Sequence, residues 1–228
     1  MHTPSIEECL SDGNGLKEHI RHILCTRKKR IIPPENLLEA AVLIPLTWNN
    51  GEPLVIVTKR SMSMEHHKGE FSFPGGSIEP EDKDLVWTAL RETQEEIGLD
   101  PKDVDVLGLL DDHISILGYR ITPVVGTIPH PYDFHINQES DLLLHVPLRL
   151  ALNDTAWMAE RTVYKDREIN IYYLPIDGGV IWGATGRILK HFADLIAGTR
   201  IPFCTVSQEV KTWLDDLLVS QSEYRASR

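Results

Sequence analysis

Apolar and polar positions along the chain follow two periods, one typical of strands and one typical of helices. Mostly apolar stretches at residues 40–46 and 53–60 flank turn-forming residues, which predicts two consecutive strands. Further strand-like stretches lie at residues 104–110, 119–128, 142–148, 162–165 and 168–174. Apolar residues three and four positions apart predict helices over residues 16–25, 83–97, 184–197 and 206–218. This arrangement predicts an α+β fold in which strands surround one central helix and further helices lie outside.

The N-terminal part of the chain is expected to lie outside the main domain. Residues 1–15 are polar and contain glycine, which favours a loosely ordered start. We therefore expect residues 1–35 to form an N-terminal extension with a short helix, and residues 36–222 to form the main domain. The extension contains a basic run at residues 27–30. We expect this run to be a solvated hinge, with contact to a substrate phosphate or an acidic partner as the alternative.

Three glutamates near the end of the second predicted helix are the first candidates for chemistry. Glu92, Glu95 and Glu96 are spaced so that their carboxylates share one helix face, where like charges repel unless a cation neutralises them. Mg²⁺ is the usual divalent ion for such oxygen ligands in phosphate chemistry. The alternative is a solvated acidic face with an ion pair between Arg91 and Glu95.

Glycines border this helix and complete a known signature. Gly75 and Gly76 allow the backbone to approach a ligand closely, and Gly98 suits the position at which a helix ends. With them the stretch resembles the Nudix box, the loop–helix–loop signature of the Nudix hydrolases. The part that fits without gaps comprises Arg91, Glu92, Glu95, Glu96, Gly98 and Leu99. The resemblance implies an α+β fold of the Nudix type, an α/β/α sandwich with a mixed central sheet.

The chain departs from this signature at three places. Asp82 stands where the box has its first glutamate, and eight residues rather than seven separate it from Arg91. Thr93 holds a position that is normally apolar. These departures lie away from the carboxylates expected to bind metal. The shorter side chain of Asp82 leaves open whether it contacts a metal directly.

The resemblance also implies the composition of a metal site. Mg²⁺ or Mn²⁺ would be held by Glu92, Glu95, Glu96 and the carbonyl oxygen of Gly75, and Arg91 would orient Glu95 through an ion pair. Family members often take their general base from outside the box. Glu139 is the candidate here, because its spacing from residues 146–148 is that seen in the family. Glu96 is the alternative base, and a plain surface role for Glu139 stays open.

A second motif upstream of the box narrows the expected substrate. Thr58, Arg60, Ser61, Gly69 and the run Phe73-Pro74-Gly75-Gly76 keep every spacing of a pattern found in Nudix coenzyme A pyrophosphatases. The resemblance implies hydrolysis of the diphosphate of coenzyme A or its thioesters. Glu65 stands where that pattern has arginine, which keeps other nucleoside diphosphate derivatives open, such as ADP-ribose or NADH. A nucleotide-binding sensor without activity is the third hypothesis.

Several other polar residues near these motifs have competing interpretations. Arg60 and Lys68 are expected to hold substrate phosphates, whereas Lys59 points to the opposite side of its strand from Arg60. We expect His66 and His67 to face solvent, and we expect Trp182 to pack in the core. The adjacent Asp111 and Asp112 are expected to be turn residues rather than ligands.

Composition then limits the possible partners. The 34 acidic and 23 basic residues give a formal charge of −11, which argues against binding to nucleic acid or to a membrane surface. A small-molecule nucleotide such as coenzyme A is the expected partner, and a homodimer is possible. The 3 cysteines are widely spaced and no signal-peptide core is visible, so we expect a cytoplasmic protein.

Overall fold

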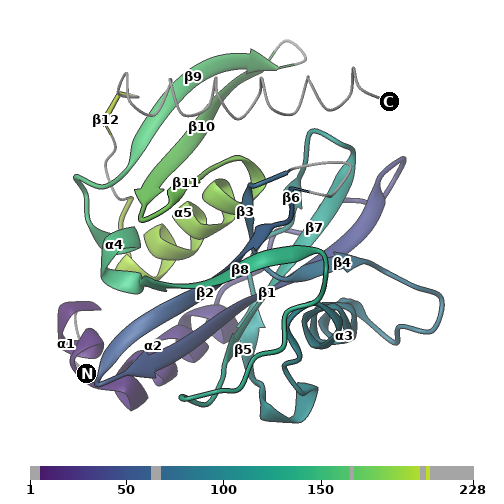
Figure 1. The fold of residues 1–228 in the computed structure, drawn as a ribbon. Helices are drawn as coiled ribbons and strands as arrows, with labels where there is room; N and C mark the ends of the chain where they lie inside the picture. Colours follow the sequence, from purple (N-terminus) through teal and green to yellow (C-terminus); the bar gives the residue numbers. More distant parts are fainter. Residues whose placement is uncertain (1–5, 63–67, 165–166, 201–203, 206–228) are drawn as a thin grey trace.

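The computed structural model describes residues 6–62, 68–164, 167–200 and 204–205. The predicted helix at residues 206–218 lies outside these ranges, as do Glu65, His66 and His67. Figure 1 shows the fold along the chain.

A mixed sheet forms the centre of the molecule (Figure 1). Its strands run in the order β3–β2–β1–β7–β5, while β4 pairs with β1, β6 with β7 and β8 with β2. Only β1 and β7 pair in parallel among these described strands, and the other pairs are antiparallel. The bounds are β1 Leu38–Asn49, β2 Glu52–Arg60, β3 Phe71–Ser72, β4 Gly75–Ser77, β5 Asp105–Leu109, β6 His113–Ile114, β7 Tyr119–Thr127 and β8 Ser140–Pro147.

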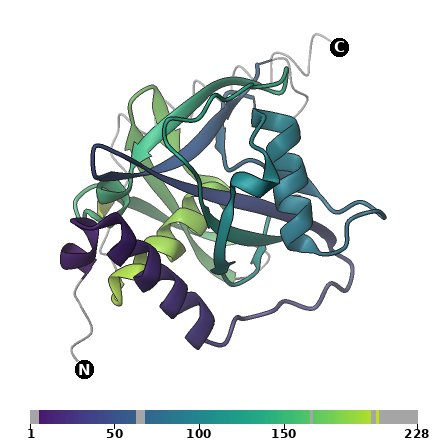
Figure 2. The ribbon, with the colours of Figure 1, turned by 90° about the horizontal axis from the view of Figure 1, so that it is seen from below.

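Helices cover both faces of this sheet, as expected for an α/β/α sandwich. Alternate residues of β1 point to opposite faces: Ala41 and Leu43 contribute to the core beneath α3 (Leu85–Ile97), and Ile44 and Leu46 to the core on the other face. That second core receives α1 (Ile6–Leu10), α2 (Gly13–Thr26) and α5 (Gly183–Ala197). Figure 2 shows α2 and α5 side by side, with α3 across the sheet from them.

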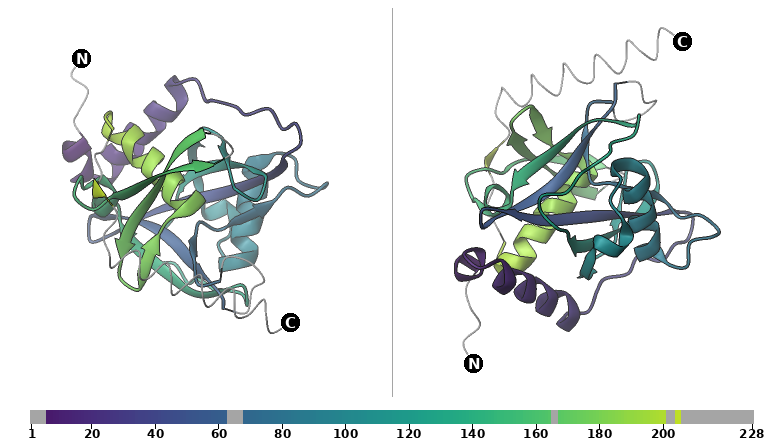
Figure 3. Two further views of the ribbon diagram at one scale, coloured as in Figure 1. Left: turned by 90° about the horizontal axis from the view of Figure 1, so that it is seen from above. Right: turned by 60° about the horizontal axis from the view of Figure 1, so that its bottom comes forward.

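A smaller sheet lies beyond α5. It comprises β9 (Met158–Tyr164), β10 (Arg167–Ile176), β11 (Gly179–Ile181) and β12 (Cys204–Thr205), in the order β11–β10–β9–β12. The short helix α4 (Leu148–Leu152) links the central sheet to it, and the 3₁₀ turn η1 (Pro101–Asp103) follows α3. Figure 1 shows α5 between this sheet and the central one, and Figure 3 gives two further views of the same arrangement. None of the helices within the described ranges is both long enough and apolar enough to span a bilayer.

The first described residues are more ordered than their composition predicts. Residues 6–10 form α1, and its Cys9 and Leu10 are buried. Asp12 then caps α2 by accepting hydrogen bonds from the N–H groups of Asn14 and Gly15, each 3.1 Å long. The expectation of loose order was therefore wrong for residues 6–15. The polar local sequence could not indicate this order, because it depends on the packing of Cys9 and Leu10 against distant parts of the chain.

The basic run that follows α2 is held by ion pairs rather than being a solvated hinge. Arg27 Nη1 lies 2.5 Å from Asp111 Oδ1, and Lys29 Nζ lies 2.7 Å from Asp112 Oδ1. Asp112 also accepts hydrogen bonds from the hydroxyl of Thr122 and the N–H of Ile32. The expectation for both aspartates was wrong as well, because they anchor this linker to the sheet instead of only making a turn.

A buried histidine lies next to these ion pairs. His113 on β6 is 6% exposed, and its Nε2 lies 3.2 Å from Nδ1 of His191 on α5. Burial, together with the positive charges of Arg187, His191 and Arg30, lowers the pKa of His113 to about 3, and Asp111 partly opposes this shift. The imidazole is therefore neutral in the folded protein at neutral pH.

This burial predicts an acid-sensitive stability. The unfolded chain binds a proton at His113 below about pH 6.5, and the folded chain does not until about pH 3. The free energy of unfolding should therefore decrease as the pH is lowered below about 6.5, and His113 alone should contribute up to about 1.4 kcal/mol per pH unit. Urea unfolding of His113→Gln between pH 7.5 and 5 should show a shallower decline than the parent protein. The exposed His135→Gln is the matched control, and an undiminished slope in His113→Gln would contradict the assignment.

Candidate metal and catalytic site

The helix α3 is fixed at both ends by the residues that border it. Asp84 caps its start by accepting a 2.7 Å hydrogen bond from the N–H of Trp87. Gly98 ends it with φ of 72°, a left-handed conformation that favours glycine. Thr93, at the position expected to be apolar, is fully buried and donates its hydroxyl to the carbonyl oxygen of Ala89 at 2.6 Å. The hydroxyl is satisfied within the helix, so the apolar face of α3 tolerates it.

Arg91 is the centre of the charged network on α3. Its Nε and Nη2 donate to the two oxygens of Asp82 at 2.9 and 3.0 Å, a bidentate pair. Asp82 also accepts from the hydroxyl of Thr88 and the N–H of Glu79, and its side chain is 1% exposed. Hydrogen bonding from Arg91 lowers the pKa of Asp82 to about 2. Asp82 is therefore committed to holding Arg91, a role that its spacing in the sequence did not reveal.

The remaining nitrogen of Arg91 faces the candidate metal ligands. Nη1 lies 3.1 Å from an oxygen of Glu92 and 3.2 Å from an oxygen of Glu95. The predicted ion pair with Glu95 is present, although the Glu95 side chain is 57% exposed. Arg91 thus pairs with the carboxylates of Glu92 and Glu95 through one nitrogen, while Asp82 holds its other two nitrogens.

Glu96 is the buried member of the acidic group. It is 5% exposed, and one of its carboxylate oxygens accepts a 3.2 Å hydrogen bond from the N–H of Gly75. Burial outweighs the Gly75 hydrogen bond and the charge of Arg60, so the pKa of Glu96 is raised to about 7. Burial also raises the pKa of Glu92. Two carboxylates that are costly to ionise in this environment lie on the same helix face.

The two glycines of the metal loop are required by close packing. A Cβ atom at Gly76 would lie 2.4 Å from the carboxyl carbon of Glu92. A Cβ atom at Gly75 would lie 2.3 Å from the carbonyl oxygen of Ala41, and Gly75 has φ of 150°. Strand β4 can therefore pair with β1 and still leave room for the carboxylate of Glu92.

The loop before β8 brings Glu139 toward Glu96. The N–H of Asn137 donates to the carbonyl oxygen of Glu96 at 2.9 Å, and the N–H of Ser61 donates to that of Glu139 at 2.7 Å. The Glu139 carboxylate lies 4.0 Å from Nη2 of Arg60, and its charge acts on Glu96. The structure therefore brings Arg60, Glu96 and Glu139 together across two strands and a helix.

The two lysines and the tryptophan considered in the sequence lie outside the group of Arg60, Glu96 and Glu139. Lys59 reaches away from Arg60, with its Nζ 3.4 Å from the carbonyl oxygen of Gly178 and above the ring of Phe71. Lys68 is buried in the turn that precedes β3. Trp182 is partly buried and stacks on Tyr173, with ring centroids 6.2 Å apart, which agrees with packing rather than ligand binding.

The chemistry of this donor set fits a hard divalent cation. Carboxylates of Glu92, Glu95 and Glu96 and the carbonyl oxygen of Gly75 are the oxygen ligands that Mg²⁺ and Mn²⁺ prefer. A bound cation would offset the cost of ionising the two buried glutamates. Within the described ranges, no three acidic, histidine or cysteine side chains already converge closely enough to hold an ion. In their present positions Glu92 and Glu95 turn toward Arg91, and Glu96 turns toward Gly75.

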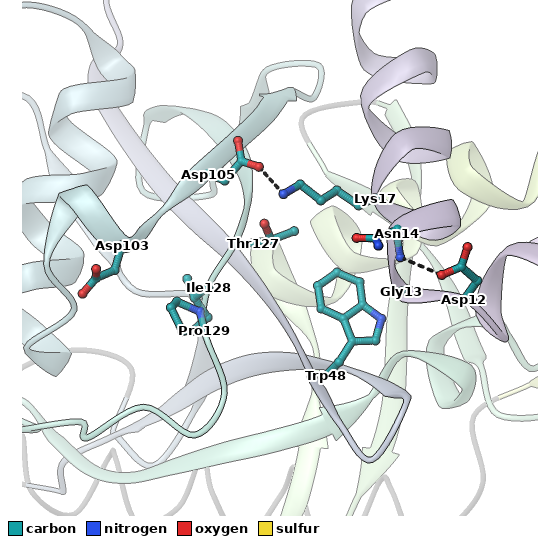
Figure 4. Close-up of a pocket in the computed structure, with 10 residues that line it drawn as sticks. All are labelled: Asp12, Gly13, Asn14, Lys17, Trp48, Asp103, Asp105, Thr127, Ile128 and Pro129. Carbon is teal, nitrogen blue, oxygen red and sulfur yellow. Dashed lines mark hydrogen bonds and ion pairs between the residues drawn. The ribbon is translucent and has the colours of Figure 1, made fainter.

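A separate cavity of about 530 Å³ lies away from these residues (Figure 4). It opens between the start of α2 and the distal ends of β1 and β7, with Trp48 and the ion pair of Lys17 and Asp105 in its wall. No residue of α3 lines it. It therefore does not belong to the carboxylate site.

Comparisons with known proteins identify the family of this chain. Residues 37–165 match the family model of the NUDIX domain. The uncharacterized Nudix hydrolase NudL of Yersinia pestis strain Pestoides F is 35% identical over 159 residues, covering 69% of this chain and 79% of its own. An Ap4A hydrolase from C. elegans is 17% identical with a TM-score of 0.43, covering 48% of this chain and 80% of that one. From the extent of the family match and the identity to NudL, we conclude that this chain is a member of the Nudix hydrolase family.

Proposed function

We propose that this Nudix hydrolase cleaves the diphosphate linkage of coenzyme A or its thioesters. The products would be 4′-phosphopantetheine, or its acylated form, and adenosine 3′,5′-bisphosphate. The observation that carries the proposal is the upstream motif from Thr58 to Gly76, whose spacing resembles that of coenzyme A pyrophosphatases. In the fold, Thr58 and Arg60 of this motif lie on β2, and Gly75 lies beside the α3 carboxylates, where its N–H donates to Glu96.

Each site residue then has a proposed role. Glu92, Glu95, Glu96 and the carbonyl oxygen of Gly75 would hold Mg²⁺ or Mn²⁺. Such an ion, when bound, offsets charge on the phosphoryl oxygens and makes water a better nucleophile at neutral pH. Arg91 keeps the glutamates oriented.

The remaining roles concern the phosphates and the proton of the attacking water. Arg60 and Lys68 would bind substrate phosphates. Glu139 is the proposed general base, and its position beside Arg60 and Glu96 supports this choice. Glu96 is the alternative base. In this proposal residues 36–222 form the catalytic domain, and residues 1–35 are an extension packed against it through α2.

A second candidate is hydrolysis of another nucleoside diphosphate derivative, such as ADP-ribose or NADH. Glu65 favours it, because the coenzyme A pattern has arginine at that position and the reversed charge would weaken binding of an anionic group. A sensor without activity is less favoured, because Glu92, Glu95 and Glu96 are all present.

Turnover of a substrate panel tests the proposed substrate. With Mg²⁺ or Mn²⁺ we expect kcat/KM for coenzyme A or an acyl-coenzyme A to exceed that for ADP-ribose and NADH. Chelation with EDTA should abolish turnover, and added Mg²⁺ should restore it, because the carboxylates alone do not activate water. Products separated by chromatography identify the bond that is cleaved. A preference for ADP-ribose or NADH would replace the first candidate with the second.

Removal of one carboxylate charge tests the metal site. Glu96→Gln should lower kcat by at least about a hundredfold, since metal ligation or proton transfer at this position is lost. The fold should persist, because the amide keeps the shape of the side chain and burial no longer opposes a charge. Glu168→Gln, at an exposed position on β10, is the matched control and should retain activity. Full activity in Glu96→Gln would rule out its assigned role.

A further inference from the structure

The last turn of α3 is bonded to the loop that leads into β8. The backbone N–H of Asn137 donates a 2.9 Å hydrogen bond to the carbonyl oxygen of Glu96. The N–H of His135 donates one of 3.0 Å to the carbonyl oxygen of Ile97. Carbonyl groups at the end of a helix have no acceptor role within it, so the loop satisfies two of them. Gly98 leaves room for this contact, because a Cβ atom there would lie 3.1 Å from Cβ of His135. The chain before β8 is thereby docked on α3 (Figure 1).

The side chain of Asn137 then holds Glu139 directly. Its Oδ1 accepts a 2.9 Å hydrogen bond from the backbone N–H of Glu139, two residues further along the chain. This is the turn that asparagine and aspartate side chains favour. The carbonyl oxygen of Glu139 accepts a 2.7 Å hydrogen bond from the N–H of Ser61. Both backbone polar groups of Glu139 are therefore bonded, which fixes the direction in which its side chain leaves the backbone.

The carboxylate of Glu139 is held less firmly than its backbone. The side chain is 48% exposed, and its ion pair with Arg60 is 4.0 Å long. Partly exposed ion pairs of this length contribute little to fixing a side chain. The position of this carboxylate therefore depends mainly on how the backbone around Glu139 is held.

A bulge in β8 brings the same segment next to Arg60. The pairing of β2 with β8 shifts between Lys59 and Arg60, so that Arg60 pairs with Ser140 and Asp141 is an extra residue on β8. Bulges of this kind re-aim the neighbouring side chains. Glu139 directly precedes Ser140, so the bulge and the Asn137 turn together determine where Glu139 lies.

We propose that Asn137 is a positioning residue for the reaction, because it holds Glu139 in place relative to Glu96 on α3. This rests on the proposed function, in which Glu139 is the general base. A general base must lie within hydrogen-bond distance of the proton that it removes. The backbone N–H of Asn137 binds α3 and its side chain binds Glu139, so one residue fixes the base relative to the helix that carries the other catalytic carboxylates.

Removal of the Asn137 side chain tests this role. Asn137→Ala keeps the N–H that bonds to Glu96 and removes only the acceptor for the N–H of Glu139. With the substrate that the parent protein cleaves fastest, kcat should fall about tenfold to a hundredfold, as expected when a base is displaced by about 1 Å. KM should change by less than about twofold, because no group that binds substrate is lost. Asn137→Asp keeps an acceptor oxygen at this position and should recover most of the lost kcat.

Another loop supplies a matched control. Asn153 makes the same turn after α4, with its Oδ1 accepting a 3.0 Å hydrogen bond from the N–H of Thr155. Asn153→Ala should leave kcat within about twofold of the parent value, because this loop does not contact α3 through the turn. An equal loss of kcat in Asn153→Ala and Asn137→Ala would overturn the specific role of Asn137.

A double-mutant cycle separates positioning from a general loss of structure. Glu139→Gln alone should lower kcat by about a hundredfold or more, because the base is lost. Adding Asn137→Ala to Glu139→Gln should then lower kcat by less than about a further twofold, since no base remains to be positioned. Thermal unfolding of each variant checks that the fold persists. Losses that multiply in the double variant would refute the proposal, because Asn137 would then act independently of Glu139.

Amide hydrogen exchange, followed by NMR, tests the structural link without turnover. The N–H of Glu139 should exchange at least about tenfold faster in Asn137→Ala than in the parent protein, and an unchanged rate would overturn the link. If Glu139→Gln keeps full activity, the base in the proposed function is wrong, and the positioning role is wrong with it. If Glu139→Gln loses activity while Asn137→Ala keeps it, the proposed function stands and the role of Asn137 alone is refuted.

Discussion

The bidentate ion pair between Asp82 and Arg91 is the interaction on which the carboxylate site depends. Asp82 lies in the loop before α3, and Arg91 lies in the middle of that helix, so the pair ties loop and helix into one unit. Breaking a buried pair of this kind costs about 3–5 kcal/mol, because a charge is left without compensation. With two of its nitrogens fixed by Asp82, Arg91 can hold Glu92 and Glu95 only with the third. The orientation of both glutamates therefore follows from a residue that need not touch substrate.

Strand β1 provides the second constraint, because it connects the two charged regions of the molecule. On one side, Val42 pairs with Gly75, which sets the loop against Glu96. On the other side, the parallel strand β7 carries Thr122, which holds Asp112 and through it the linker after α2. The α3 carboxylates and the charged linker after α2 are thus connected to opposite edges of the same part of one strand.

The sequence predicts those parts of the structure that depend on local pattern. Spacing predicted a helix at residues 83–97 that ends at Gly98, and the structure has it at Leu85–Ile97 with the close-packed glycines 75 and 76 beside it. The assignment to the Nudix family followed from the same residues and is confirmed.

The missed features are long-range contacts. Arg27 and Asp111 are 84 positions apart, and nothing near either residue indicates the other. The burial of Cys9 and Leu10 depends in the same way on distant packing. The role of Asp82 could have been recognised only by noting that an aspartate too short for a metal role can still pair with Arg91.

The central claim is that the pair of Asp82 and Arg91 orients the carboxylates. Mn²⁺ binding to Asp82→Asn, followed by electron paramagnetic resonance, tests this claim most directly, with Asp105→Asn as the matched control from another ion pair. The account predicts Mn²⁺ affinity at least about tenfold weaker in Asp82→Asn than in the control, and equal affinity in the two variants would contradict it.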